Sequence, residues 1–135
     1  MIENLYHEEE NEKAFKKWMR KNAECYGQVC YVYAHPNDYE SYGLSFDQAS
    51  SYVNALAGCF GAKIYLYLCE KEDGWVRVEY RSNHGYPVVE VAKAFGGGGH
   101  RYAAGSEIVG GKPAIRDILE ALDKVEGDFP CTKKN

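Results

Sequence analysis

Hydrophobic and polar residues follow one another along this chain in patterns that predict alternating helices and strands. From about Glu8 to Asn22 the early acids and late bases suit the helix macrodipole, and apolar residues recur at helical spacing. The apolar stripe consists of Ala14, Phe15, Trp18 and Met19. We therefore expect a helix here that packs one face on the core.

Two continuous apolar runs and one alternating run predict a sheet. Residues 28–34 and 62–69 are apolar on both alternating sets, as in interior strands. After a polar turn at 70–74, residues 75–81 alternate, which predicts a hairpin. Val76, Val78 and Tyr80 share one face of this strand, and Trp75, Arg77, Glu79 and Arg81 share the other.

Turn residues and further apolar periodicity place the remaining elements. We expect a turn at 35–38, an irregular loop to Phe46, a helix from Asp47 to about Cys59, a short helix at 87–95, a strand at 103–109 and a helix at 113–125. This order predicts an α/β (α+β) fold, with a single small domain and a mixed β-sheet of about four to five strands with flanking helices.

Composition and charge narrow the class of protein. The 135 residues, 45% of them hydrophobic, suffice for one domain with a core. A net charge of −4 argues against a general nucleic-acid coat, although a local basic patch would suffice for a small nucleotide. Five cysteines without a CxxC pair, and no visible signal peptide, predict a cytoplasmic protein with reduced thiols. No apolar run approaches the roughly 20 residues that span a bilayer, so we expect no membrane partner.

The run Gly96-Gly97-Gly98-Gly99-His100 is the strongest candidate for a binding site. Without Cβ atoms, such a loop lets a bound group approach the peptide N–H groups, which can form a nest for an anion. His100 adds a donor at the loop's edge, and the small residues Ala103-Ala104-Gly105 allow close packing behind it. The alternative is a flexible linker, but both flanks are typical of ordered segments.

Arg81 and Ser82 end the predicted hairpin shortly before this loop. An arginine there could make bidentate bonds to a phosphate. The alternative is a surface arginine that pairs with Glu79 or another acid.

Together, Arg81-Ser82, the Phe95–His100 segment and Ala103-Ala104-Gly105 resemble the C-terminal substrate-binding domain of DHH-family phosphoesterases. That family includes RecJ-like exonucleases, nanoRNases that also cleave adenosine bisphosphate, and cyclic dinucleotide phosphodiesterases. The resemblance covers about 62–109 by motif and implies a DHH-associated substrate-binding domain at 25–135. It leaves 1–24 as a helix that could connect to a catalytic domain.

The resemblance implies a set of substrate-binding residues, which hold phosphate and base. Tyr102 could stack on a base or pack on the sheet. The set is Arg81, Ser82, Gly97, Gly98, Gly99, His100, Tyr102, Ala103, Ala104 and Gly105. The implied partners are a short single-stranded nucleic acid, a dinucleotide or a nucleoside phosphate, with a DHH catalytic domain as a further partner.

The family's Asp-His-His triplet is absent from this sequence. We therefore expect no hydrolysis and no cofactor in this chain alone, with Mn²⁺ or Mg²⁺ held only by a separate catalytic domain. Two alternatives stay open. One is a complete small metal-dependent phosphodiesterase that uses His35, Asp38, His84 and His100; the other is a structural or oligomerisation module in which the glycines only make a tight turn.

Overall fold

The computed structural model describes residues 2–82, 85–109 and 112–128. The described strands are β1 (Glu24–Tyr26), β2 (Val29–Ala34), β3 (Ile64–Glu70), β4 (Trp75–Ser82), β5 (Gly98–His100) and β6 (Ala103–Val109). The described α-helices are α1 (Ile2–Asn22), α2 (Pro36–Glu40), α3 (Phe46–Ala49), α4 (Val89–Ala94) and α5 (Lys112–Asp123). Two short 3₁₀ turns, η1 (Val53–Leu56) and η2 (Cys59–Gly61), lie between α3 and β3.

The strands form one mixed sheet in the order β1-β2-β3-β4-β6-β5. Only β2 and β3 pair in parallel among the described strands, and the other neighbours are antiparallel. The predicted class is confirmed: this is a single α/β domain. The sheet has six strands among the described residues rather than four to five, because the short edge strands β1 and β5 were not predicted.

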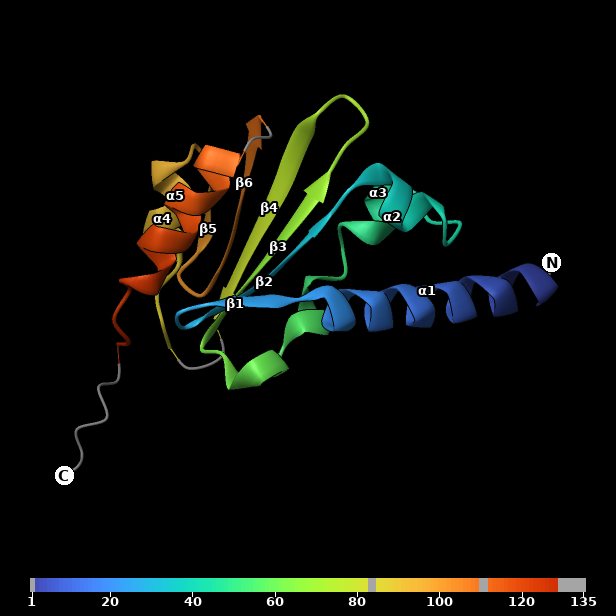
Figure 1. Ribbon diagram of the computed structural model, residues 1–135, viewed down its shortest axis with the longest axis horizontal. Helices are drawn as coiled ribbons and strands as arrows, with labels where there is room; N and C mark the ends of the chain where they lie inside the picture. Colours follow the sequence, from blue (N-terminus) through green and yellow to red (C-terminus); the bar gives the residue numbers. More distant parts are fainter. Residues whose placement is uncertain (1, 83–84, 110–111, 129–135) are drawn as a thin grey trace.

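Helices cover both faces of this sheet (Figure 1). On one face, α4 and α5 pack against apolar side chains of β3, β4 and β6, including Leu66, Val78 and Ile108. On the other face, α1, α2, α3 and η1 pack against β2 and β3. Phe15 and Met19 of α1 are fully buried there and Trp18 is partly buried, so these three of the four predicted stripe residues pack on the core, whereas Ala14 is exposed.

The helical layer of α1 to α3 and η1 covers only half of its face. Its buried cluster includes side chains of β2 and β3 but none of β4, β6 or β5. The outward residues of β4 on this face are partly or fully exposed, whereas Val76, Val78 and Tyr80 are buried on the other. The predicted division of β4 into two faces is therefore confirmed, and half of one sheet face lacks a helix over it.

The expected helix from Asp47 to Cys59 is wrong. After one turn of α3, the hydroxyls of Ser50 and Ser51 bond back to the carbonyls of Asp47 and Gln48, at 3.4 Å and 2.7 Å. Serines that satisfy backbone carbonyls in this way compete with a continuing helix. The irregular loop expected before Phe46 also contains the short helix α2.

Candidate functional site

The uncovered half of the sheet forms a shallow hollow of about 480 Å³ over β4, β6 and β5. Residues that lie directly opposite one another on neighbouring strands project to the same face. Arg81 lies opposite Ala103, which lies opposite His100 on β5. Glu79, Gly105 and Gly98 form the next row. The sequence-predicted arginine and histidine are thus on one face, with small residues between them.

Gly96 and Gly97 do not form the predicted anion nest. Their amides donate to the carbonyls of Lys93 and Ala92, at 3.1 Å and 2.8 Å, and close the C-terminus of α4. This is the Schellman arrangement, in which a glycine with positive φ follows the helix; Gly96 has φ +87°. Two amides of the predicted loop are therefore occupied, and Gly98 to His100 continue as a strand rather than a loop.

The floor of the hollow has no side chains at Gly98 and Gly105, although the fold does not require glycine at either position. A Cβ atom on Gly98 would meet no atom within 4 Å, and one on Gly105 would make only ordinary contacts, the closest at 3.4 Å. Neither residue has a positive φ. Glycine inside a strand lowers its stability, and it often marks a place where another group approaches the backbone. The pair therefore makes a flat, accessible surface of peptide groups.

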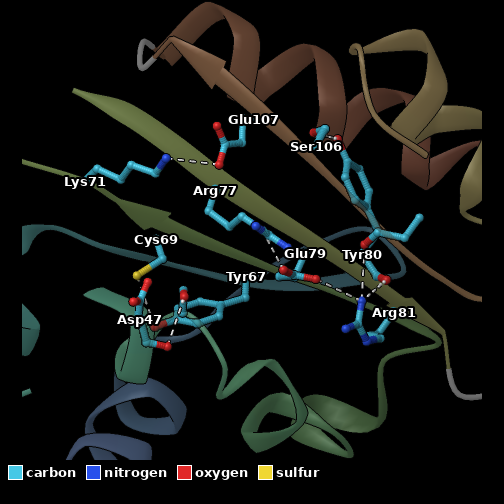
Figure 2. A network of polar contacts seen from close by, with 12 residues as sticks. Asp47, Tyr67, Cys69, Lys71, Arg77, Glu79, Tyr80, Arg81, Ser106 and Glu107 are labelled. Carbon is cyan, nitrogen blue, oxygen red and sulfur yellow. Dashed lines mark hydrogen bonds and ion pairs between the residues drawn. The ribbon is translucent and has the colours of Figure 1, made fainter. Parts of the chain in front are cut away.

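Arg81 is held by its own chain at the rim of this floor (Figure 2). Its Nη1 lies 3.2 Å from Glu79 Oε1 and donates to the carbonyls of Tyr80 and Ala104, at 2.9 Å and 3.2 Å. Arg77 Nε donates to the other carboxylate oxygen of Glu79 at 2.8 Å. The alternative pairing with Glu79 is therefore present. It still leaves the Arg81 side chain one-quarter exposed beside the hollow.

Arg77, Glu79 and Glu107 line the hollow although they were not among the predicted site residues. Glu107 is paired with Lys71 at 3.1 Å (Figure 2). The alternation of residues 75–81 already placed Arg77 and Glu79 on the same face as Arg81, and that signal could have identified them.

His100 is exposed on the edge strand β5, across β6 from Arg81. Neighbouring strands lie about 4.8 Å apart, so the two side chains start about 10 Å from each other. That gap suits a phosphate or a base placed between them more than a direct contact. The edge position also leaves one side of β5 without a strand neighbour.

Four residues of the predicted set do not line the hollow: Ser82, Gly97, His100 and Tyr102. The Ser82 hydroxyl accepts a bond from the amide of Tyr86 at 2.8 Å. The Tyr102 hydroxyl donates to Asp128 at 2.6 Å, and its ring is only partly buried. In this arrangement Tyr102 neither packs into the sheet core nor lies over the floor.

Asp128 closes the turn between β5 and β6 from far along the chain. Arg101 binds both of its carboxylate oxygens, at 2.6 Å and 2.8 Å, beside the bond from Tyr102. These donors lower the pKa of Asp128 to about 2. The amide of Asp128 also donates to the carbonyl of Gly85 at 2.9 Å. No local sequence signal could have identified this pairing, since the partners are 26 and 27 residues apart.

Of the residues of the alternative metal site, only His35 and Asp38 come together in the described part of the chain, with His35 Nδ1 3.4 Å from Asp38 Oδ2. The backbone amide of His35 donates to the Asp38 carboxylate at 2.8 Å, which caps the start of α2. His100 lies at the opposite edge of the sheet, and His84 lies outside the described residues. Within 2–82, 85–109 and 112–128, no group of three or more histidine, cysteine or acidic residues could hold a metal ion. In the same ranges, none of the helices has the length and hydropathy needed to cross a membrane.

Solved structures share this fold. An exopolyphosphatase-related protein from Bacteroides fragilis superposes with a TM-score of 0.72 at 18% identity, covering 85% of this chain and 34% of that protein. A pGpG-specific phosphodiesterase, PggH from Vibrio cholerae, superposes with a TM-score of 0.64 at 13% identity, covering 90% of this chain and 42% of that protein.

Curated relatives are similar in sequence. The bifunctional oligoribonuclease and PAP phosphatase NrnA of Mycoplasma genitalium is 32% identical over 117 residues, which cover 87% of this chain and 36% of the relative. NrnA of Bacillus subtilis is 32% identical over 96 residues, covering 69% of this chain and 30% of the relative. The chain thus spans about a third of the length of these relatives. The DHHA1 domain model matches residues 27–128, so this chain belongs to the DHHA1 family, the domain found in DHH-type phosphoesterases.

Proposed function

We propose that this chain is the substrate-binding part of a DHH-family phosphoesterase. In this proposal the open half of the sheet holds the phosphate and base of a nucleoside phosphate, a dinucleotide or a short single strand. Relatives named for action on oligoribonucleotides, PAP and pGpG support this class of ligand.

The Gly98–Gly105 pair carries the proposal. These cross-strand partners could each accept a methyl group, yet both lack one, on the floor of the hollow that Arg81 lines. The next row along the strands runs from Arg81 through Ala103 to His100. A planar base or a phosphate can contact bare peptide groups on this floor. Arg81 and His100 can then bind negatively charged oxygen from either side.

Hydrolysis would require a second domain. Two-metal phosphoester hydrolysis needs clustered carboxylates and histidines, and the described residues of this chain contain no such cluster. We propose that Mn²⁺ or Mg²⁺ is held by a DHH catalytic domain, and that this chain orients the substrate toward it. The four cysteines of the described ranges are free thiols, which supports a cytoplasmic setting.

Calorimetric titration with pGpG and with adenosine bisphosphate tests the proposal. The wild-type chain should bind at least one of them, and His100→Ala and Arg81→Gln should each weaken the Kd about tenfold or more, because each removes a charge-assisted contact. Lys93→Ala is the matched control: this exposed lysine on α4 forms an ion pair with Glu90 and does not line the hollow, so the change should alter the Kd less than about twofold.

A structural or oligomerisation module would give a different result. It would show no saturable binding, or would bind equally well in all three variants, and either outcome contradicts the proposal. Added manganese should not produce cleavage of pGpG by this chain alone. Cleavage would instead support the complete small enzyme.

A further inference from the structure

A second hollow lies on the other side of the sheet from the proposed nucleotide site. It measures about 630 Å³ and lies between the β1–β2 edge of the sheet and α5. Tyr31 and Tyr33 project from β2 on this side, since Val32 between them is buried in the cluster under α1. Tyr26 of β1 completes an aromatic wall, which faces Ile115 and Leu119 of α5.

The three tyrosine hydroxyls all point to carboxylates. Tyr33 donates to Glu70 at 2.8 Å, Tyr31 donates to Glu24 at 3.0 Å, and Tyr26 lies at the limit of a bond to Glu120 at 3.5 Å. Burial and these acids raise the pKa of both Tyr31 and Tyr33, so they remain neutral donors at physiological pH. The bonds fix the ring orientations, and a donor that points to a carboxylate leaves its ring face more electron-rich.

The charge around this hollow is predominantly negative. Asp117 and Arg116 are the charged residues that line it. The three glutamates do not line it, but they lie at the hydroxyl ends of its tyrosines. Four carboxylates therefore surround a single guanidinium, which lies 4.0 Å from Glu120. Such a rim would repel the phosphates of a nucleic acid. It would attract a cation, which electron-rich ring faces also favour.

We propose that this hollow is a second ligand site, which takes an organic cation, either an alkylammonium or a guanidinium group, against the faces of Tyr26, Tyr31 and Tyr33. The volume is that of a small-molecule site. The cation would lie over the rings with its charge toward Asp117 and the glutamates, while Ile115 and Leu119 contact its alkyl part. This site is separate from the proposed nucleotide site and does not depend on it.

Choline and its neutral isostere dimethylbutanol test the site by NMR titration of the whole chain, followed on the Ile115 methyl and the Tyr33 ring signals. We expect saturable shifts with choline and at least threefold weaker binding of dimethylbutanol, because the two differ mainly in charge. Tyr33→Leu should weaken choline binding about three- to tenfold, whereas Tyr33→Phe retains the ring and should preserve most of it.

Charge variants distinguish a cation site from an apolar groove. Asp117→Asn should weaken choline binding, and Arg116→Gln should strengthen it, because each changes the local charge in a known direction. Lys93→Gln on α4 is the control and should leave it unchanged. Spermidine and an acetylated arginine amide then separate a free polyamine from a polypeptide side chain as the source of the cation.

Three outcomes would overturn the proposal. If no probe gives a saturable shift, the hollow is not a ligand site. If dimethylbutanol binds as tightly as choline, the groove is merely apolar. If Arg116→Gln weakens choline binding, the charge around the hollow does not attract the cation. Circular dichroism of each variant establishes that it is folded before it is titrated.

Discussion

At Gly98 a methyl group would meet no atom within 4 Å, whereas at Gly97 it would lie 2.0 Å from the carbonyl oxygen of Gly105. Gly97→Ala should therefore destabilise the fold by about 2–3 kcal/mol, since backbone atoms must move to admit the methyl group. Gly98→Ala should leave the free energy of unfolding unchanged or raise it by up to about 1 kcal/mol, because it restricts the unfolded chain. Urea denaturation of both variants measures the difference.

The same two variants separate structure from binding. If the bare floor receives a ligand, Gly98→Ala should weaken nucleotide binding at least tenfold in calorimetry despite its intact stability. Gly105→Ala, its cross-strand partner, should do the same. A stable Gly98→Ala protein with wild-type affinity would show that the ligand does not touch this floor.

The sequence identified the glycine run as a candidate site, but it could not show which glycines are needed for the fold and which are free to contact a ligand. Gly96 and Gly97 close α4, and Gly98 is unconstrained, yet all three are identical in the sequence. The division depends on where the carbonyl of Gly105 lies, which only the pairing of β5 with β6 determines. The position of Arg81, in contrast, was predictable. Simple alternation along β4 places it on the face opposite Val76, Val78 and Tyr80.

At the scale of elements, segments with a clear period were predicted, and so was the short helix α4, whereas the three-residue strands were not. The strand at 75–81 and the helix at 113–125 carry several repeats of their pattern, and the structure has β4 and α5 there. The strands β1 and β5 have three residues each, too few to show a period. β5 is also made of two glycines and a histidine, residues that favour strands weakly or not at all.

The β5–β6 turn is held by Asp128, and this contact should titrate. Its pKa is about 2 in the folded chain against an ordinary value of 3.8, so the contact stabilises the fold above about pH 4 and is lost as the pH falls through about 2. Asp128→Asn should lower the free energy of unfolding at pH 7, and its difference from wild type should shrink toward zero near pH 2. Urea denaturation across this range measures it.

Asp117→Asn provides the control for this titration, since no contact of that exposed carboxylate is recorded in the described part of the chain. The free energy of unfolding of Asp117→Asn should differ little from that of the wild type at every pH. Hydrogen exchange at Gly99 and Ala103 should also quicken in Asp128→Asn, because the turn between β5 and β6 loses its anchor. Equal exchange in both proteins would mean that backbone bonds alone hold the turn.

At the scale of the whole molecule, one sheet face is covered by helices over β2 and β3 and is open over β4, β6 and β5. The open half beside β4, β6 and β5 carries Arg77, Arg81 and His100, while the chain as a whole has a net charge of −4. A negative protein whose hollow holds two arginines among two glutamates can bind a few phosphates but cannot follow a long strand. The salt dependence of binding should therefore be shallow.

Each phosphate contact on a single strand contributes about −0.7 to the slope of log K against log salt concentration. For about two contacts the slope should be about −1.4 for a trinucleotide, measured from about 50 to 200 mM salt. Arg81→Gln should make it less steep by about 0.7, since one contact is lost. A slope steeper than about −4 would require an extended basic track, which this half of the sheet does not offer because Glu79 and Glu107 lie among its arginines.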